Sequence, residues 1–431
     1  MPLVRAGGGV TAPVSPGALM IDATPLDEQM RSGIARVTVR LAQELARAAR
    51  PDEAPAAEVE LVRPVAGRFR RDVSLEGEVF GAKPGRGATP GADATAAFVS
   101  ACVPPAERAD EWWAGIAGYR SRGGLYVQII HDLLPITVPD FFDQGLRGYF
   151  PQWLQRVAGA ADVIVSVSEA TASDLERWLA AQEVPTASHR LVVRNGADVP
   201  GALKAPAGAA AVTGGAGAVG ISGGPEGPPQ PDAPDALGAR GAADAAVQPA
   251  GSSGHSPAQV LVVGTIEPRK GVEAVMDAAE ALWARGEDVS FTLVGARGWI
   301  GEPTLQRLSQ LDAGPQPLRW LAGASDEQLL ECYRTADLLL APSRAEGFGL
   351  PIVEAQALGV PVLARDIPVF REVGGDQASY FTGDASLPDA ISAALSSAPE
   401  GRQSKQARTW AAAADELLDV VRSAHRQKAA G

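Results

Sequence analysis

Two glutamates, Glu346 and Glu354, flank a short segment whose residue types can bind an anion and a polyol side by side. Gly347 and Gly349 lie between them, and Pro351 is expected at the first position of a helix. The first turn of a helix leaves backbone N–H groups unpaired and carries a partial positive charge, so it can bind a phosphate. Because carboxylates would repel that phosphate, we expect both glutamates to bind neutral hydroxyl groups, as on a sugar or a ribose. The alternative is a solvated Glu346 and a Glu354 that only complements the helix dipole.

Positive charge follows another predicted strand. Residues 259–265 are rich in β-branched side chains, and Arg269 and Lys270 come shortly afterwards. Residues 336–341 predict a buried strand that leads to Glu346. Ligands of parallel sheets bind beyond the carboxyl ends of the strands, where a guanidinium and an ammonium can hold a diphosphate. We therefore expect Arg269, Lys270 and Glu346 to share one site, with two solvated cations before a helix as the alternative.

The elements that would position these residues alternate between strand and helix. After residue 258 we expect strands at 259–265, 289–294, 318–321, 336–341 and 360–364, and helices at 272–285, at 325–333 and after Pro351. Before residue 200 the pattern is weaker, with strands at 18–21, 125–130, 163–167 and 191–193 and a helix at 37–47. Such alternation predicts an α/β fold with two Rossmann-like, doubly wound domains that face each other across a cleft.

Composition predicts where the domains end. Between Gly201 and Pro257, 37 of 57 residues are Gly, Ala or Pro, which leaves too little apolar surface to offset backbone ordering. We expect one domain at 1–200, a disordered linker or insertion at 201–257, a second domain at 258–403, and a C-terminal helix at 404–431 that packs back across the hinge.

Charge and composition exclude some classes of protein. The 431 residues carry a net charge of −13, which argues against a nucleic-acid-binding role. Two cysteines are too few for a disulfide framework, and no apolar run approaches the ~20 residues of a membrane-spanning helix. We expect a cytoplasmic protein, with peripheral association at the inner face of the cytoplasmic membrane as an open alternative.

Several of these segments resemble the motifs of one enzyme family. Arg269-Lys270-Gly271, the two glutamates around Gly347-Phe348-Gly349, His131-Asp132 and Asn195-Gly196 are similar to motifs of the retaining GT-B glycosyltransferases of family 4, also called glycosyltransferase group 1. Three segments, the sequence around His131 and residues 365–368 and 371–373, most resemble bacterial mannosyl- and rhamnosyltransferases of surface polysaccharide assembly. The resemblance implies an acceptor-side N-terminal domain and a C-terminal domain that binds a nucleotide sugar.

The resemblance also implies roles for individual residues. Arg269 and Lys270 would bind the donor diphosphate and stabilise its charge as it leaves. Glu346 would bind hydroxyls of the transferred sugar, Glu354 would bind the ribose, and His131 would lie near the sugar. Backbone amides of the intervening segment would also contact the donor, and a loop residue would lie beside donor and acceptor; these are Gly347, Phe348, Gly349 and Leu350, and Gly33.

The expected reaction needs no cofactor besides the nucleotide sugar, for which GDP-mannose is favoured. The acceptor would be a glycan or a lipid-linked sugar. The four histidines form no visible metal cluster and no Asp-x-Asp triplet occurs, so protein cations would neutralise the diphosphate. We expect a metal-independent, retaining transfer in which the acceptor hydroxyl enters on the side from which the diphosphate leaves. Asp132 is the alternative as a nucleophile for a double displacement.

Other interpretations stay open. A GT-B epimerase or phosphorylase, or a non-catalytic protein that only binds a nucleotide sugar, would share the same site. His131 has an alternative role as an ordinary strand-end histidine. An aromatic and basic cluster has three interpretations, a membrane contact, a glycan contact or ordinary packing: Trp112, Trp113, Tyr119, Arg120 and Arg122. A local basic group is expected to be solvated: Arg63, Arg68, Arg70 and Arg71.

Overall fold

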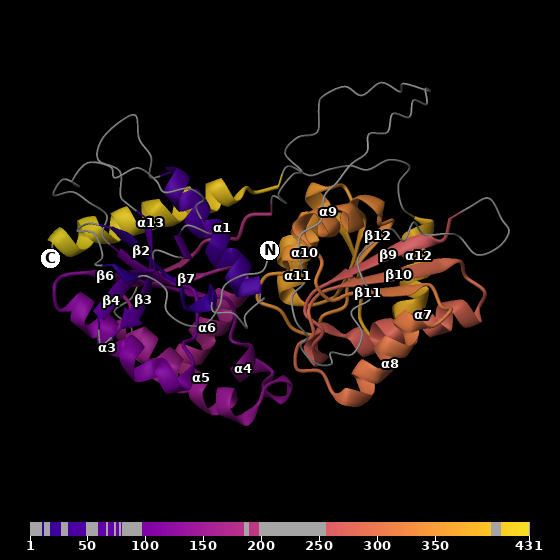
Figure 1. Ribbon diagram of the computed structural model, residues 1–431, viewed down its shortest axis with the longest axis horizontal. Helices are drawn as coiled ribbons and strands as arrows, with labels where there is room; N and C mark the ends of the chain where they lie inside the picture. Colours follow the sequence, from indigo (N-terminus) through magenta and orange to yellow (C-terminus); the bar gives the residue numbers. More distant parts are fainter. Residues whose placement is uncertain are drawn as a thin grey trace, which may run out of the picture. The chain divides into compact units, whose positions relative to one another are not determined.

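The computed structural model of the chain contains two α/β sheets, each with helices on both faces (Figure 1). It describes residues 11–12, 18–26, 33–48, 59–65, 68–72, 75–76, 79, 97–184, 189–197, 256–397 and 407–430. Nearly all of the segment expected as a linker, 201–257, lies outside these residues, so the domain limits stay a prediction.

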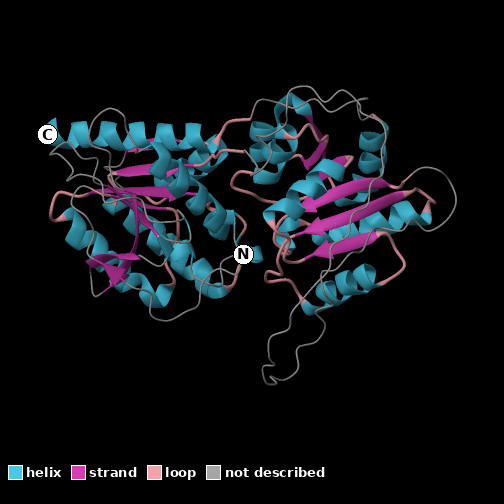
Figure 2. Ribbon diagram, turned by 45° about the horizontal axis from the view of Figure 1, so that its top comes forward, coloured by secondary structure: helices cyan, strands magenta, loops and turns pink. Residues whose placement is uncertain are grey.

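The C-terminal half contains a parallel sheet of six described strands in the order β11-β10-β9-β12-β13-β14. Figure 2 draws strands in magenta and the helices around them in cyan. The strands are β9 Ala258–Val263, β10 Val289–Val294, β11 Leu318–Leu321, β12 Leu338–Ala341, β13 Val362–Arg365 and β14 Ala378–Phe381. This is the strand order of a Rossmann fold, which reverses between β9 and β12. The loops after β9 and β12 therefore lie next to each other at the carboxyl edge.

Helices cover both faces of this sheet because its strands are apolar on both sides. Val260 and Val262 belong to the core under α7 Val272–Ala284, α8 Glu302–Ala313 and α12 Leu387–Ser396. Leu261 belongs to the core under the helices of the opposite face, which are α9 Asp326–Thr335, α10 Leu350–Ala357 and α11 Pro368–Gly374. Short 3-10 helices complete this half: η4 Pro268–Lys270, η5 Gly375–Gln377 and η6 Asp384–Ser386.

The N-terminal half contains a sheet in the order β1-β4-β3-β2-β5-β6-β7-β8. The strands are β1 Thr11–Ala12, β2 Leu19–Asp22, β3 Val59–Val65, β4 Arg68–Asp72, β5 Ala97–Ser100, β6 Leu125–Ile130, β7 Val163–Ser166 and β8 His189–Val192. Its neighbours pair in parallel except that β4 is antiparallel to β1 and β3.

Long helices also cover this second sheet. α1 Gly33–Ala48 and α13 Trp410–Ala430 pack on one face, and α3 Ala109–Arg120, α5 Gln144–Ala160 and α6 Glu169–Ala181 pack on the other. Figure 1 shows α1 and α13 on the side of the sheet opposite α3 and α5. The shorter elements are α4 Leu134–Thr137, η1 Thr24–Leu26, η2 Ala106–Arg108 and η3 Pro139–Phe141.

The C-terminal helix joins the N-terminal half at the point where the chain leaves that half. The Ala197 amide donates to the Arg408 carbonyl (2.9 Å), and Arg408 Nε donates to the Arg194 carbonyl (3.1 Å). A Cβ added at Gly196 would lie 2.3 Å from the Trp410 amide nitrogen, so only glycine allows this approach. α13 then packs along α1 and buries Trp410, Leu417 and Val421.

Most expected elements of the C-terminal half are confirmed. β10 and β11 have the expected bounds, and Ser325 and Gln328 form the expected capping box of α9. α10 begins at Leu350, so the expectation that Pro351 takes its first position is wrong by one residue.

The arginines expected to be solvated are partly paired instead. Arg63 pairs with Asp72 (2.7 Å), and Arg71 pairs with Glu76 (2.7 Å) and with the fully buried Glu60 (3.5 Å). The expectation was wrong for these two residues because the carboxylates come from neighbouring strands and turns that were not predicted.

Candidate functional site

A cluster of two cations and two carboxylates lies at the carboxyl edge of the C-terminal sheet, where the strand order reverses. Arg269 and Lys270 lie in η4 after β9, and Glu346 lies in the loop after β12. Arg269 Nη1 donates to Glu346 Oε2 (3.0 Å), and Lys270 Nζ donates to Glu346 Oε1. Glu267, which precedes η4, contacts Arg269 Nε through its Oε2 (2.9 Å). The sequence prediction that Arg269, Lys270 and Glu346 share one place is confirmed.

The backbone fixes the two loops against each other. The Arg344 amide donates to the Arg269 carbonyl (2.8 Å), so the loops after β9 and β12 are hydrogen-bonded. Gly271 has φ +72°, and a Cβ there would lie 2.7 Å from the Pro342 carbonyl oxygen. Glycine is therefore needed at 271 both for the left-handed conformation and for the close approach.

The cluster strongly favours an ionised Glu346. Burial alone would raise the pKa of Glu346, but Lys270 and Arg269 overcome this effect and lower the pKa to about 2. Burial raises the pKa of Glu267, although Arg269 and Lys270 oppose the shift. Two cations at the carboxyl edge are thus balanced by carboxylates, and an anionic ligand could replace Glu346 as their partner.

A small cavity of about 20 Å³ lies beside the cluster. It holds about one water molecule and is far too small for a sugar. Lys270 and Glu346 line it together with Gly264, Thr265, Ser343 and Pro351.

Glu354 lies apart from this cavity, in the buried interior of the molecule. It is 3% exposed, and its Oε2 accepts from the Tyr333 hydroxyl (2.7 Å). Its Oε1 pairs with Arg36 of α1 in the N-terminal half (2.8 Å). Burial raises the pKa of Glu354, with Arg36 opposing the shift. In this arrangement the carboxylate already has two partners, so its expected role at a ribose stays a prediction.

Gly347 is a contact between the two halves of the chain. A Cβ at Gly347 would lie 1.9 Å from the His131 carbonyl oxygen. The Gly347 carbonyl accepts from Ser168 Oγ (2.8 Å) and from Thr171 Oγ1 (3.2 Å) at the start of α6. Because Gly347 has no side chain, the backbone of the N-terminal half can lie close to it. The expected contact between the Gly347 amide and a donor stays a prediction.

His131 and Asp132 follow β6, next to that contact. Burial lowers the pKa of His131 to about 4, and its Nε2 has no hydrogen-bond partner among the described residues. Burial also raises the pKa of Asp132, although Arg269 opposes the shift. The imidazole is thus neutral at pH 7, and its buried Nε2 is unpaired among the described residues.

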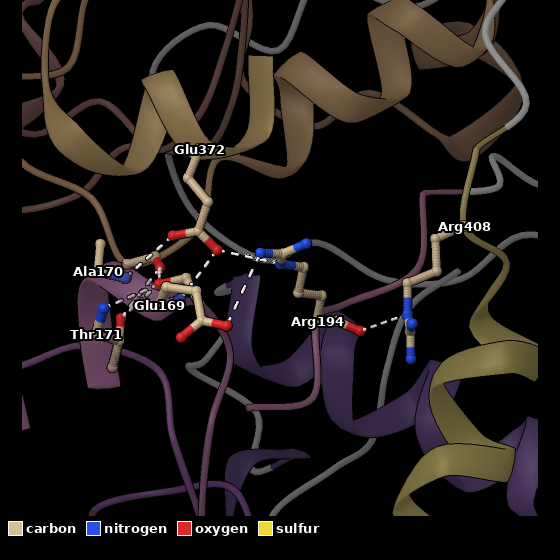
Figure 3. Close-up of polar contacts among 8 residues, drawn as sticks. Glu169, Ala170, Thr171, Arg194, Glu372 and Arg408 are labelled. Atoms are coloured by element: carbon tan, nitrogen blue, oxygen red, sulfur yellow. Dashed lines mark hydrogen bonds and ion pairs between the residues drawn. The ribbon is translucent and has the colours of Figure 1, made fainter. Parts of the chain in front are cut away.

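A second contact between the halves is centred on Glu372 of α11 (Figure 3). Its Oε1 accepts from the Glu169 amide (2.9 Å) and its Oε2 from the Ala170 amide (3.0 Å), at the N-terminus of α6. Arg194 Nε also donates to Oε1 (3.1 Å). A helix N-terminus and an arginine are favourable partners for a carboxylate, so Glu372 joins α11 to the N-terminal half.

The remaining expected site residues lie at or just before the starts of helices α10 and α1. Phe348 is buried, Gly349 precedes α10 with φ +100°, and Leu350 is the first residue of α10. Gly33 is the first residue of α1.

Sequence reasoning missed further residues of the site: Glu267, Arg36, Tyr333, Ser168, Thr171 and Glu372. Only the Ser168 to Thr171 spacing, which is typical of a helix cap, could have indicated one of them.

The two-sheet arrangement is the GT-B fold of glycosyltransferases. HepE of Anabaena, solved in complex with UDP and glucose, covers 96% of this chain with 98% of its own, at a TM-score of 0.53 and 15% identity. Sucrose-phosphate synthase from Thermosynechococcus elongatus matches equally well, with 95% and 98% of the chains covered, a TM-score of 0.53 and 15% identity. At such identities the likeness concerns the fold.

The sequence of the C-terminal half is similar to one family of enzymes. Residues 248–416 match the family model described as Glycosyl transferases group 1. The serotype-specific mannosyltransferase WbdA of Escherichia coli is 31% identical over 277 residues, 63% of this chain and 29% of WbdA. The O-antigen chain mannosyltransferase B of the same species is 36% identical over 134 residues, 31% of this chain and 34% of that protein. The chain thus spans about a third or less of the length of these relatives.

Two further features are absent from the described residues. Among them, no group of histidine, cysteine and acidic side chains could hold a metal ion. None of the described helices is both long and apolar enough to span a membrane.

Proposed function

We propose that the protein is a glycosyltransferase that moves mannose from GDP-mannose to a glycan or lipid-linked acceptor in surface polysaccharide synthesis. The observation that carries this proposal is the meeting of Arg269, Lys270 and Glu346 where the strand order reverses. Ligands of such sheets bind at this point. The match to the group 1 family supports the reaction class, and the likeness to WbdA and to the O-antigen chain mannosyltransferase supports mannose and the polysaccharide acceptor.

In the proposed donor complex the diphosphate replaces Glu346 as the partner of Arg269 and Lys270. Two preorganised cations then stabilise the charge that develops on the leaving diphosphate. The released Glu346 carboxylate accepts hydrogen bonds from the hydroxyls of the mannosyl group. Glu354 exchanges Arg36 for the ribose hydroxyls, and the neutral His131 hydrogen-bonds to the sugar.

Retention and metal independence also belong to the proposal. The acceptor hydroxyl enters on the face from which the diphosphate leaves and transfers its proton to it. Arg269 and Lys270 supply the positive charge that a divalent cation supplies in other transferases. The reaction takes place in the cytoplasm, at the inner face of the membrane when the acceptor is lipid-linked.

A donor panel with a matched pair of variants tests the proposal. Thermal unfolding is followed with GDP-mannose, UDP-glucose, UDP-N-acetylglucosamine and dTDP-rhamnose. We expect the largest stabilisation with GDP-mannose, its loss in Arg269→Gln, and its retention in Arg285→Gln, which removes an exposed arginine that pairs with Asp389. Stabilisation by none of the donors would overturn the proposal.

The same panel separates the rival functions. A protein that only binds nucleotide sugars would be stabilised by a donor but would transfer its sugar to no glycan. An epimerase would convert the donor without an acceptor. Product analysis of each donor, with and without an oligomannose acceptor, therefore distinguishes the three functions.

A further inference from the structure

A large groove lies in the N-terminal half, away from the residues of the candidate site. Its volume is about 700 Å³, within the range of ligand pockets, and α3, α5 and α13 form its walls. Among the described residues that line it, three are cationic, Arg120, Arg156 and Lys428, and one, Asp162, is acidic. These lining residues thus carry an excess of two positive charges in a chain with a net charge of −13.

The groove lies at the opposite edge of the sheet from the candidate site. Asp162 and Gly124, which both contact Lys428 Nζ, come directly before the parallel strands β7 and β6. His131 and Ser168 follow the carboxyl ends of the same strands. One strand length, roughly 20 Å for six residues, therefore separates the two places. A ligand in the groove would not contact the reacting atoms.

The cations of the groove are incompletely neutralised. Arg120 Nη2 and Lys428 Nζ share one carboxylate oxygen, Asp162 Oδ1, at 3.2 Å each. Asp162 also accepts from the Tyr126 amide (2.8 Å). Arg156 stacks on the Trp113 ring, 4.6 Å from its centroid, and is largely exposed. Among the described residues, no acidic partner of Arg156 is found.

Two residues of the groove wall, Trp113 and Arg120, carry unused hydrogen-bond donors. Four buried polar atoms of α3 and α5 have no hydrogen-bond partner within the described part of the chain: Trp113 Nε1, Arg120 Nε, Tyr149 Oη and Trp153 Nε1. Trp113 is 6% exposed and forms part of the wall, and Arg120 Nε belongs to a second wall residue. Buried donors without partners are rare, and each suggests a missing acceptor.

Apolar residues complete the wall. Ile116, Ala117 and Ala160 line the groove beside the charged side chains. The volume is also much larger than a phosphate ion needs. A ligand that fits both features carries an anionic, acceptor-rich group on a larger body.

We propose that this groove binds a phosphate ester, whose phosphate oxygens accept from Arg120, Arg156 and Lys428 while the esterified group lies along Ile116 and Ala117. A phosphate matches the fork of a guanidinium and accepts several hydrogen bonds at once. The phosphate comes from a lipid headgroup or from a soluble phosphorylated sugar, and both have the same recognition chemistry. This site is independent of the proposed transferase function.

Calorimetric titration of the whole chain with inorganic phosphate tests the proposal. The titration is made in an Arg269→Gln background, so that phosphate binding at the candidate donor site does not mask the groove. We expect one phosphate site there, weakened about tenfold or more by Arg156→Gln with Lys428→Gln. Arg177→Gln on α6 is the control, since Arg177 is exposed and pairs with Asp174 of the same helix. Circular dichroism checks that each variant is folded.

The source of the phosphate is decided by two further measurements. Co-sedimentation with phosphatidylglycerol vesicles, lost in the Arg156 and Lys428 variant, assigns a lipid headgroup. Saturable binding of mannose 1-phosphate without vesicle binding assigns a soluble ligand. Two results would overturn the proposal: no phosphate binding in the Arg269→Gln background, or equal affinity with and without Arg156 and Lys428. The single variant Arg156→Gln keeps the test valid if the double variant fails to fold.

Discussion

The carbonyl oxygen of His131 occupies the space that a side chain at residue 347 would need. A Cβ on Gly347 would lie 1.9 Å from that oxygen, and the Gly347 carbonyl is held by Ser168 and Thr171. Gly347 comes from the glycine-rich loop of the C-terminal half, whereas the other three residues come from the N-terminal half. The contact therefore joins the loop of the candidate donor site to the end of β6.

Replacement of Gly347 by alanine is expected to destabilise the protein. The new methyl group forces the two backbones apart, which typically costs about 1–3 kcal/mol at a packed position. Thermal or urea unfolding measures this loss. Gly148→Ala in α5 is the control, because no atom lies within 4 Å of its added Cβ and alanine favours the helix. Equal stability of the Gly347 variant and the wild type would show that the contact is not held in solution.

Glu346→Gln is expected to separate binding from transfer. The amide keeps the shape of the side chain but frees Arg269 and Lys270 from their shared carboxylate, so GDP should bind at least as tightly as to the wild type. Transfer should fall about 100-fold or more, because the sugar loses a charged hydrogen-bond acceptor. Calorimetry with GDP and a transfer assay with GDP-mannose give the two values. Glu302→Gln on α8 controls for a general charge effect; unimpaired transfer in the Glu346 variant would contradict the assigned role.

His131 is expected to make the stability pH-dependent. Burial sets its pKa at about 4 in the folded protein, against 6.5 as the ordinary value. Because the folded pKa is the lower one, the stabilising contribution of the neutral imidazole is complete above pH 6.5 and is lost as the pH falls towards 4. At pH 5 the loss is about 2 kcal/mol. Urea unfolding at pH 7.5 and pH 5 should show this loss in the wild type and in His189→Gln, whose histidine is exposed, but not in His131→Gln. Parallel pH profiles of wild type and His131→Gln would refute it.

Glu372→Gln is expected to loosen the start of α6. The Glu372 carboxylate accepts from the amides of Glu169 and Ala170 and pairs with Arg194, and loss of such a cap costs about 1 kcal/mol. Hydrogen exchange of those two amides should become faster, whereas the exchange of α7 should stay unchanged. Glu331→Gln, an exposed residue of α9, is the control. Unchanged exchange at Glu169 and Ala170 would mean that Glu372 is not their partner in solution.

The fold of the C-terminal half could be predicted because its signals are local. The strands β10 and β11 and the capping box of α9 depend on residues close together in the sequence. The hairpin of β3 and β4 was not predicted. Nothing in the local sequence shows that Arg63 and Arg71 have partners. In the structure they pair with three carboxylates, those of Asp72, Glu60 and Glu76.

The part of the candidate site that depends on local sequence signals could also be predicted. Arg269, Lys270 and Glu346 each follow a strand of one sheet, so the rule for the carboxyl edge brings them together. The partners of Glu354 could not be predicted, because Arg36 comes from the other half and nothing in the local sequence indicates their meeting. The Glu372 contact was missed for the same reason.

The hydrogen bond between Ala197 and Arg408 has a consequence for the order in which the protein can fold during synthesis. The last helix that packs on the N-terminal half, α13, is translated only after the whole C-terminal half. Until then, the face of α1 that packs against Trp410, Leu417 and Val421 has no cover. The six strands of the C-terminal sheet all lie between Ala258 and Phe381, so this half can complete its sheet before α13 is made. A nascent chain that stops before residue 407 therefore leaves the earlier-made half unfinished and the later-made half complete.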